Sequence, residues 1–194
     1  MSALQLIAGL GNPGSRYADT RHNSGANFVF ALAQQFGASL KVESKFQGLV
    51  GRCGFFGEDV RLLVPTTYMN LSGEAVQAIT HFYKIPPENV LIAYDEVAFE
   101  PGIVKLKTGG GHNGHNGIRD IMRTIGADFH RLRIGVGHPG DKNRVTSYLT
   151  QSKIPEKERV QIEDAYNFTD EVIKLIVKGE WQAAMNKLHM REVQ

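Results

Sequence analysis

The chain has 194 residues, 42% of them hydrophobic, and a formal net charge of +2. This length suits a single domain over residues 1–194, and the lone cysteine, Cys53, excludes an intramolecular disulfide. No apolar run approaches the roughly 18–20 residues that cross a bilayer, and the N-terminus lacks the pattern of a secretory signal, so we expect a soluble, cytoplasmic protein.

The first half of the chain alternates between strand-like and helix-like patterns. Residues 4–10 form a short apolar run that ends at glycine, as buried strands do. Apolar residues then recur at helical spacing over 26–36, and Thr20 is a candidate N-cap for this helix. Apolar runs on both sides of Gly57-Glu58-Asp59 predict a hairpin of strands 49–56 and 60–65. Residues 70–83 predict a second helix.

The second half continues this alternation. Three more strands are predicted by short apolar or alternating runs, at 90–94, 103–107 and 131–136. A glycine-rich loop at 109–114 leads into a short helix that ends near Gly126, and the tail from about 155 to 190 is helical with a break near Gly179. This order predicts an α/β fold: a single twisted, mixed sheet sandwiched by helices, with a helical C-terminal tail.

Basic residues are concentrated in the segment 105–144. It contains eight Lys or Arg and three Asp, a net charge of +5, whereas the other residues together carry −3. A local positive field of this kind attracts polyanions such as nucleic acids. A solvated surface without a partner would have the same composition, so charge alone leaves both interpretations open.

The motif GLGNPG at 9–14 matches the G-x-G-x-x-G pattern of dinucleotide-binding proteins. However, Pro13 and the polar stretch 15–20 separate its glycines from the next helix, and no acid lies about 20 residues further on to hold a ribose. We interpret the motif as a tight turn that presents Asn12 at the carboxyl end of a strand. A nucleotide-dependent oxidoreductase remains an alternative.

Two titratable residues are candidates for acid–base chemistry. TRHNSG at 20–25 places His22 in the first turn of a predicted helix, whose positive end would keep the imidazole neutral, as a general base must be. Asp95 ends the apolar run LIAYDE and could orient a histidine through its ring N–H. The plain alternatives are a surface histidine, and an acid that caps a turn or pairs with an arginine.

Two other segments carry candidate binding residues. In PTTYMN at 65–70, Tyr68 could stack on a terminal base and Asn70 could bind a peptide backbone, although a core tyrosine and a helix cap are alternatives. KLKTGGGHNGHNG at 105–117 predicts a loop that grips phosphate and presents amides. Its two histidines lack the cysteine or carboxylate partners of a zinc site, so no metal is expected.

Covalent catalysis has no clear candidate nucleophile. The sequence contains neither the G-x-S-x-G of a nucleophile elbow nor a P-loop, and nothing near Cys53 would activate its thiol. Water is therefore the expected nucleophile. A non-catalytic RNA-binding module, which would need neither His22 nor Asp95, is the alternative from a different class.

Four stretches, taken together and in this order, resemble the bacterial-type peptidyl-tRNA hydrolases over nearly the whole chain: GLGNPGSRYADTRHNSG, RLLVPTTYMNLSGEAV, GGGHNGHNGIRDI and FHRLRIGVGHPGDKNRV. The resemblance implies hydrolysis of the ester between a peptide and the 3′-terminal ribose of tRNA, by a monomer without a cofactor. Asn113 stands where the family pattern has glycine, and VAFEPG at 97–102 differs from the usual LDLPPG.

The resemblance also implies roles for individual side chains. His22 would be the general base that deprotonates the attacking water, and Asp95 would hold it in its basic form. Asn12 would lie beside the scissile ester and help tell a blocked α-amine from a free one. Substrate would be bound by aromatic, amide and basic side chains: Tyr17 and Tyr68 at the 3′ end of tRNA, Asn70 and Asn116 on the peptide and terminal nucleotide, His115 in support of Asn116, and Lys107 and Arg133 on the 5′ phosphate.

Overall fold

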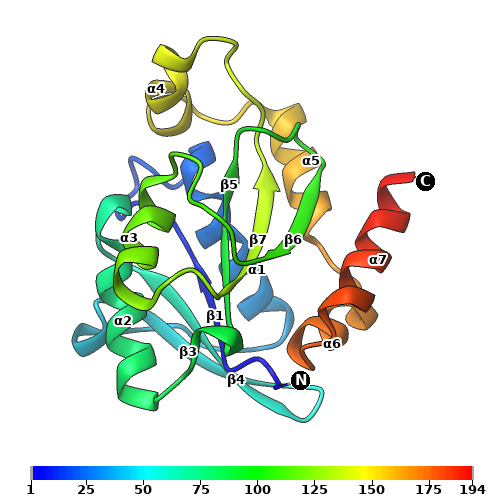
Figure 1. Ribbon diagram of the computed structural model, residues 1–194. Coiled ribbons are helices and arrows are strands. Elements are labelled where there is room, and N and C mark those ends of the chain that lie inside the picture. Colours follow the sequence, from blue (N-terminus) through cyan, green and yellow to red (C-terminus); the bar gives the residue numbers. More distant parts are fainter. Residues whose placement is uncertain (1, 194) are drawn as a thin grey trace.

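A mixed seven-stranded sheet lies between two layers of helices in the computed structural model, which describes residues 2–193 (Figure 1). The strand order is β2-β3-β4-β1-β5-β7-β6. The strands are β1 (Leu6–Gly9), β2 (Lys41–Glu43), β3 (Gly48–Phe55), β4 (Glu58–Pro65), β5 (Val90–Glu96), β6 (Val104–Thr108) and β7 (His130–Gly135). The predicted α/β fold with a single mixed sheet is confirmed.

Two hydrophobic cores fill the space between the sheet and its helices. One face is covered by α1, α5, α6 and α7, and the other by α2 and α3. The helices are α1 (Ser24–Gln35), α2 (Ser72–Tyr83), α3 (Asn116–Ile125), α4 (Val145–Thr150), α5 (Glu156–Tyr166), α6 (Asp170–Val177) and α7 (Trp181–Val193). Every residue of β5 is buried, as expected for a central strand covered on both faces.

Strand direction brings two distant segments to one edge of the sheet. β1 pairs in parallel with β4 on one side and β5 on the other, with Gly9 opposite Ala93. The carboxyl ends of β1 and β5 therefore lie side by side, and the loops that follow them meet there. In open α/β sheets this edge is where ligands bind.

Glycines let α1 begin in close contact with these strand ends. A Cβ atom on Gly25 would lie 2.1 Å from the carbonyl oxygen of Ala93, and one on Gly9 would lie 2.2 Å from the carbonyl oxygen of Gly25. No larger residue fits either position without moving the helix away from the sheet. The short 3-10 helix η1 (Arg21–Asn23), directly before α1, is thereby held against the end of β5.

The structure departs from the sequence predictions at several helix ends. Thr20 caps no helix, because its hydroxyl donates instead to the carbonyl of Tyr17. The second helix begins at Ser72 after a 3-10 turn, η3 (Met69–Leu71), and the C-terminal tail is also interrupted at residues 167–169. The short helix α4 was not predicted from the sequence. Among the described residues, no helix has both the length and the apolar character needed to span a bilayer.

Candidate active site

A cleft of about 430 Å³ opens at the carboxyl ends of β1 and β5. Its walls are the loop after β1, η3, the glycine-rich loop before α3, and α4. Seven of the ten predicted site residues line it: Asn12, His22, Tyr68, Asn70, Asp95, His115 and Asn116. Tyr17, Lys107 and Arg133 are not among the residues that line this cleft. Tyr17 contacts Tyr68 at its rim, whereas Lys107 and Arg133, the predicted phosphate contacts, lie on β6 and β7.

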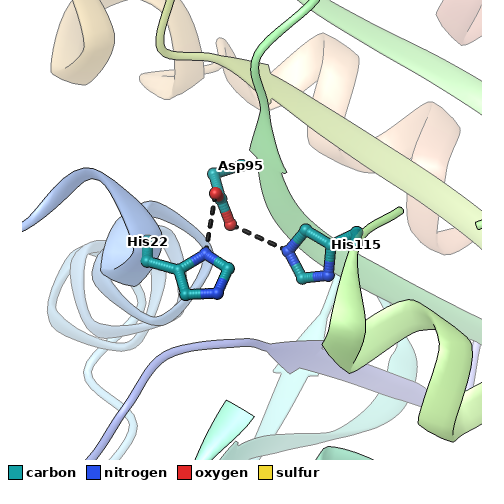
Figure 2. A group of neighbouring side chains, drawn as sticks. All are labelled: His22, Asp95 and His115. Atoms are coloured by element: carbon teal, nitrogen blue, oxygen red, sulfur yellow. Dashed lines mark hydrogen bonds and ion pairs between the residues drawn. The ribbon is translucent and has the colours of Figure 1, made fainter. Parts of the chain in front are cut away.

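His22 and Asp95 are in direct contact, as the sequence predicts. The Nδ1 atom of His22 lies 2.8 Å from Oδ2 of Asp95, and the Asp95 side chain is almost fully buried. Figure 2 shows Asp95, from β5, between His22, from η1, and His115 on the other side. The alternatives of a surface histidine and of an acid paired with an arginine are therefore wrong.

The second oxygen of Asp95 is bound by His115, a contact that the sequence did not predict. His115 Nε2 lies 2.9 Å from Oδ1 of Asp95, while His115 Nδ1 accepts a hydrogen bond from the backbone N–H of Ile118 at 3.2 Å (Figure 2). The His115 side chain thus caps α3, whose first residue is Asn116. Both ring nitrogens have partners within the protein, which leaves His115 little capacity to bind substrate directly.

These contacts determine where the ring protons lie. His115 Nδ1 accepts a hydrogen bond, so it carries no proton, and the proton of the neutral ring is on Nε2, which donates to Asp95. The Asp95 carboxylate can only accept, so His22 donates to it through Nδ1. His22 Nε2 is then unprotonated in the neutral ring, as a general base requires.

The Asp95 carboxylate controls the basicity of His22. Burial by itself lowers the pKa of His22, but the charge of Asp95 and the hydrogen bond to it outweigh burial and raise the pKa above its ordinary value. The expectation that a helix end favours the neutral ring is wrong in direction, because His22 lies in η1 and the nearby carboxylate dominates. Burial alone would raise the pKa of Asp95, yet His22 and His115 hold it well below its usual range.

Asn12 is held rigidly at the edge of the cleft. Its backbone N–H donates to Asn23 Oδ1 at 2.8 Å, and Asn23 Nδ2 donates back to the Asn12 carbonyl at 2.9 Å. The side-chain oxygen of Asn12 accepts from the N–H of Met69 at 2.7 Å. This bond orients the amide, so that among the described residues its NH₂ group has no protein partner and is a donor available to the cleft.

Aromatic and amide groups project from the cleft rim. Tyr68 is 58% exposed, and its ring meets that of Tyr17 edge to face, with centroids 6.4 Å apart. Asn70 lies in η3 with an exposed side chain and does not cap α2, whose N-cap position is Leu71. The core interpretation of Tyr68 and the cap interpretation of Asn70 are therefore wrong, and both side chains are free to contact a ligand.

The basic segment divides into exposed and internal residues. On the antiparallel pair β6–β7, Lys105 is opposite Arg133 and Lys107 is opposite Arg131, which places the four side chains on one face of the sheet. Arg131, however, is 1% exposed, and its guanidinium donates to the carbonyls of Gly110 and Gly111. Arg131 therefore anchors the glycine-rich loop, and the charge count from the sequence overstates the basic surface.

The glycine-rich loop accommodates its departure from the family pattern. Asn113 has a φ of 49°, in the left-handed region that favours glycine but that asparagine tolerates better than most residues. His112 accepts a hydrogen bond from the N–H of Gly114 at 2.9 Å, and so belongs to the loop and not to the Asp95 cluster. Asparagine is therefore compatible with the backbone conformation at this position.

The atoms of His22, Asp95 and His115 are close enough together to be considered as a metal site, since their ligand atoms lie within 4.8 Å of one another. Both histidine nitrogens that face Asp95 already donate hydrogen bonds to it, at 2.8 and 2.9 Å. A metal ion would have to displace these protons and separate the three side chains. The geometry is that of a carboxylate held by two N–H donors.

Comparison with known proteins identifies the family of this chain. The family model for peptidyl-tRNA hydrolase matches residues 6–194. The peptidyl-tRNA hydrolase of Acinetobacter baylyi is 51% identical over 189 residues, covering 97% of each chain, and that of Pectobacterium atrosepticum is 52% identical over 191 residues, with the same coverage. The crystal structure of the Acinetobacter baumannii enzyme superposes with a TM-score of 0.93 and 52% identity, covering 97% of this chain and 95% of that one. The chain therefore belongs to the peptidyl-tRNA hydrolase family.

Proposed function

We propose that this protein hydrolyses the ester between a peptide, or an N-blocked aminoacyl group, and the 3′-terminal ribose of tRNA. The observation that carries the proposal is the hydrogen bond between His22 Nδ1 and Asp95, which directs the proton of the neutral ring to Nδ1 and leaves Nε2 to act as a base in a cleft of the size of a small-molecule site. Family membership supports the same reaction. We propose that the protein acts as a monomer in the cytoplasm and that it needs no cofactor.

The reaction begins with water held by His22 Nε2. As the water oxygen attacks the ester carbonyl carbon, Nε2 takes one of its protons, and the carbonyl oxygen becomes an oxyanion. When the tetrahedral intermediate collapses, the bond from the carbonyl carbon to the ribose oxygen breaks, and the imidazolium returns its proton to that oxygen. The products are a peptide with a free carboxyl group and tRNA with a free 3′ hydroxyl.

Asn12 is suited to stabilise the oxyanion, because its NH₂ group is fixed before substrate arrives. We expect Asn12→Ala to lower kcat by about 10²–10³-fold with little change in KM, since the hydrogen bond strengthens as negative charge develops. Steady-state kinetics with N-acetylated aminoacyl-tRNA measures both constants. A variant with the wild-type kcat would remove Asn12 from the reacting centre.

The side chains around the cleft are suited to bind the terminal base and the peptide at the 3′ end of peptidyl-tRNA. The exposed ring of Tyr68, supported by Tyr17, can stack on the terminal base, because every base has a flat π face. The amides of Asn70 and Asn116 each offer a donor and an acceptor, as a peptide backbone and a nucleotide both require. His115 supports this arrangement indirectly, by capping α3 at Asn116 and by holding Asp95.

Lys107 and Arg133 are proposed to bind the tRNA phosphates from β6 and β7. We expect Lys107→Ala and Arg133→Ala each to raise KM and leave kcat nearly unchanged. Each should also reduce the magnitude of the slope of log affinity against log salt concentration by about 1, because one phosphate contact is lost. Fluorescence titrations of tRNA at several salt concentrations measure the slope. Lys41→Ala, at the opposite end of the sheet, is the matched control. Unchanged slopes in both β6–β7 variants would place the tRNA elsewhere.

The reaction itself is tested with N-acetylated and unblocked aminoacyl-tRNA as parallel substrates. The proposal expects release of free tRNA from the N-acetylated substrate, much slower release from the unblocked one, and no turnover by His22→Ala. Binding of tRNA without release by the wild-type protein would favour the non-catalytic RNA-binding module. Binding of a dinucleotide would reopen the oxidoreductase alternative.

A further inference from the structure

Arg21, next to His22 in the chain, is a buried cation that the proposed reaction does not use. It is 5% exposed and contacts two helices from the distant C-terminal part of the chain. One of these, α4, forms a wall of the cleft through Val145, Thr146, Leu149 and Thr150. Arg21 therefore connects the turn that carries His22 to another wall of the candidate active site.

The Arg21 guanidinium makes four contacts with these helices and the turn between them. Nη1 donates to the carbonyl of Tyr148 at 3.3 Å and to Oγ of Ser152 at 3.2 Å. Nη2 pairs with the Glu158 carboxylate on α5 at 3.1 Å. The carbon atom of the guanidinium also lies 3.8 Å from the centre of the Tyr148 ring, a cation–π contact. The planar shape of arginine satisfies all of these partners at once.

Helix α4 depends on such contacts for its position. It has only six residues, three of them β-branched, and a helix of this length is not stable by itself. In Figure 1 it lies at the top of the molecule, away from the layers that cover the sheet. Its main packing contact outside its own segment is with η1, which contains Arg21. The Tyr148 hydroxyl adds one bond, to the carbonyl of Val136 at 2.7 Å.

We propose that Arg21 is a positioning residue that fastens α4 to the turn carrying His22, and thereby sets the width of the substrate cleft. The proposal rests on the function proposed above for its effect on substrate, but the contact itself can be tested without substrate. Without Arg21, α4 should move away from η1 while the hydrogen bond from His22 to Asp95 remains, because that bond involves neither α4 nor α5.

The first experiment compares Arg21→Met with the wild-type protein. Hydrogen–deuterium exchange should show loss of amide protection over residues 145–150 and unchanged protection over β5. With N-acetylated aminoacyl-tRNA, KM should rise by about tenfold and kcat should change less than about threefold, in line with the loss of a hydrogen-bonded charge. The acid limb of the pH profile should stay at its wild-type position, since Asp95 still faces His22.

Arg159→Met is the matched control, because Arg159 lies on α5 and pairs with Glu156 and Glu163 but not with α4. It should leave both exchange and KM unchanged. If Arg21→Met does not fold, Glu158→Gln removes one partner of the same guanidinium and should give a smaller change in the same direction. Wild-type protection and KM in the variant that folds would overturn the proposal.

An engineered disulfide can test whether restoring the connection between the two segments restores function to Arg21→Met. Thr20 and Lys153 form an isolated antiparallel bridge between the two segments that Arg21 connects. Paired residues of this kind have Cα separations of about 4.5–5.5 Å, within the range of a disulfide. In the Arg21→Met background, Thr20→Cys with Lys153→Cys should restore protection and KM when oxidised and lose both on reduction. Failure of the oxidised protein to recover would also overturn the proposal.

Failure of this proposal and failure of the proposed function can be told apart. A wild-type protein that does not hydrolyse the ester would refute the proposed function, and the hydrogen–deuterium exchange data would still decide whether Arg21 positions α4.

Discussion

Replacing His22 with alanine is expected to lower kcat for N-acetylated aminoacyl-tRNA by about 10²–10⁴-fold, the usual contribution of a general base. The substitution removes the Nε2 atom that would accept the proton from water, while Asn12, Asn70 and Asn116 remain in place to bind substrate. KM and tRNA affinity should therefore change little. Quenched time courses with labelled tRNA, together with a binding titration, separate the two effects.

Two controls distinguish loss of chemistry from loss of structure. Thermal unfolding reports whether His22→Ala still folds, which we expect because His22 lies at the cleft and not in either hydrophobic core. His112→Ala removes another histidine that lines the same cleft, and the one hydrogen bond of its ring to a described residue comes from the N–H of Gly114. It should retain most of the activity. Wild-type turnover by folded His22→Ala would refute the proposed mechanism.

Asp95→Asn is expected to reduce kcat by up to about 10⁴-fold, even though the side chain keeps its shape. An amide NH₂ group in place of Oδ2 would donate to His22 Nδ1 and leave the ring proton on Nε2, where it blocks the base. The carbonyl oxygen of the amide would remain at the Oδ1 position and still accept from His115 Nε2–H, so the His115 contact favours this orientation of the amide. Kinetics at the pH optimum of each protein measures the loss.

The same variant makes a prediction about pH. In the wild-type protein the Asp95 carboxylate raises the pKa of His22 above its ordinary value of 6.5, so kcat/KM should rise with pH through an apparent pKa above 6.5. Without the carboxylate, burial is the remaining effect, and it lowers the pKa. The acid limb of the residual activity in Asp95→Asn should therefore move to lower pH. A limb at the wild-type position would show that another group titrates.

Most of the strands follow from the sequence because their signals are local. The runs that became β1, β5 and β7 are apolar or alternating over a few residues, and the hairpin of β3 and β4 surrounds a glycine turn. Helix α4 is different. Its six residues have no strong helical pattern, and α4 is held by two contacts outside its own segment. Arg21 reaches it from more than 100 residues away, and the Tyr148 hydroxyl bonds to the carbonyl of Val136, directly after β7.

By itself, the sequence indicated most of the strands and helices, though not β2 or α4, and its motifs predicted ten site residues, seven of which line the cleft. Only the tertiary structure decided how those residues interact. It placed one carboxylate between His22 and His115, turned the pKa shift of His22 upward, and buried Arg131 beneath a loop. The physical reason is that ring protonation and side-chain burial depend on neighbours brought together by folding, and a linear pattern does not contain those distances.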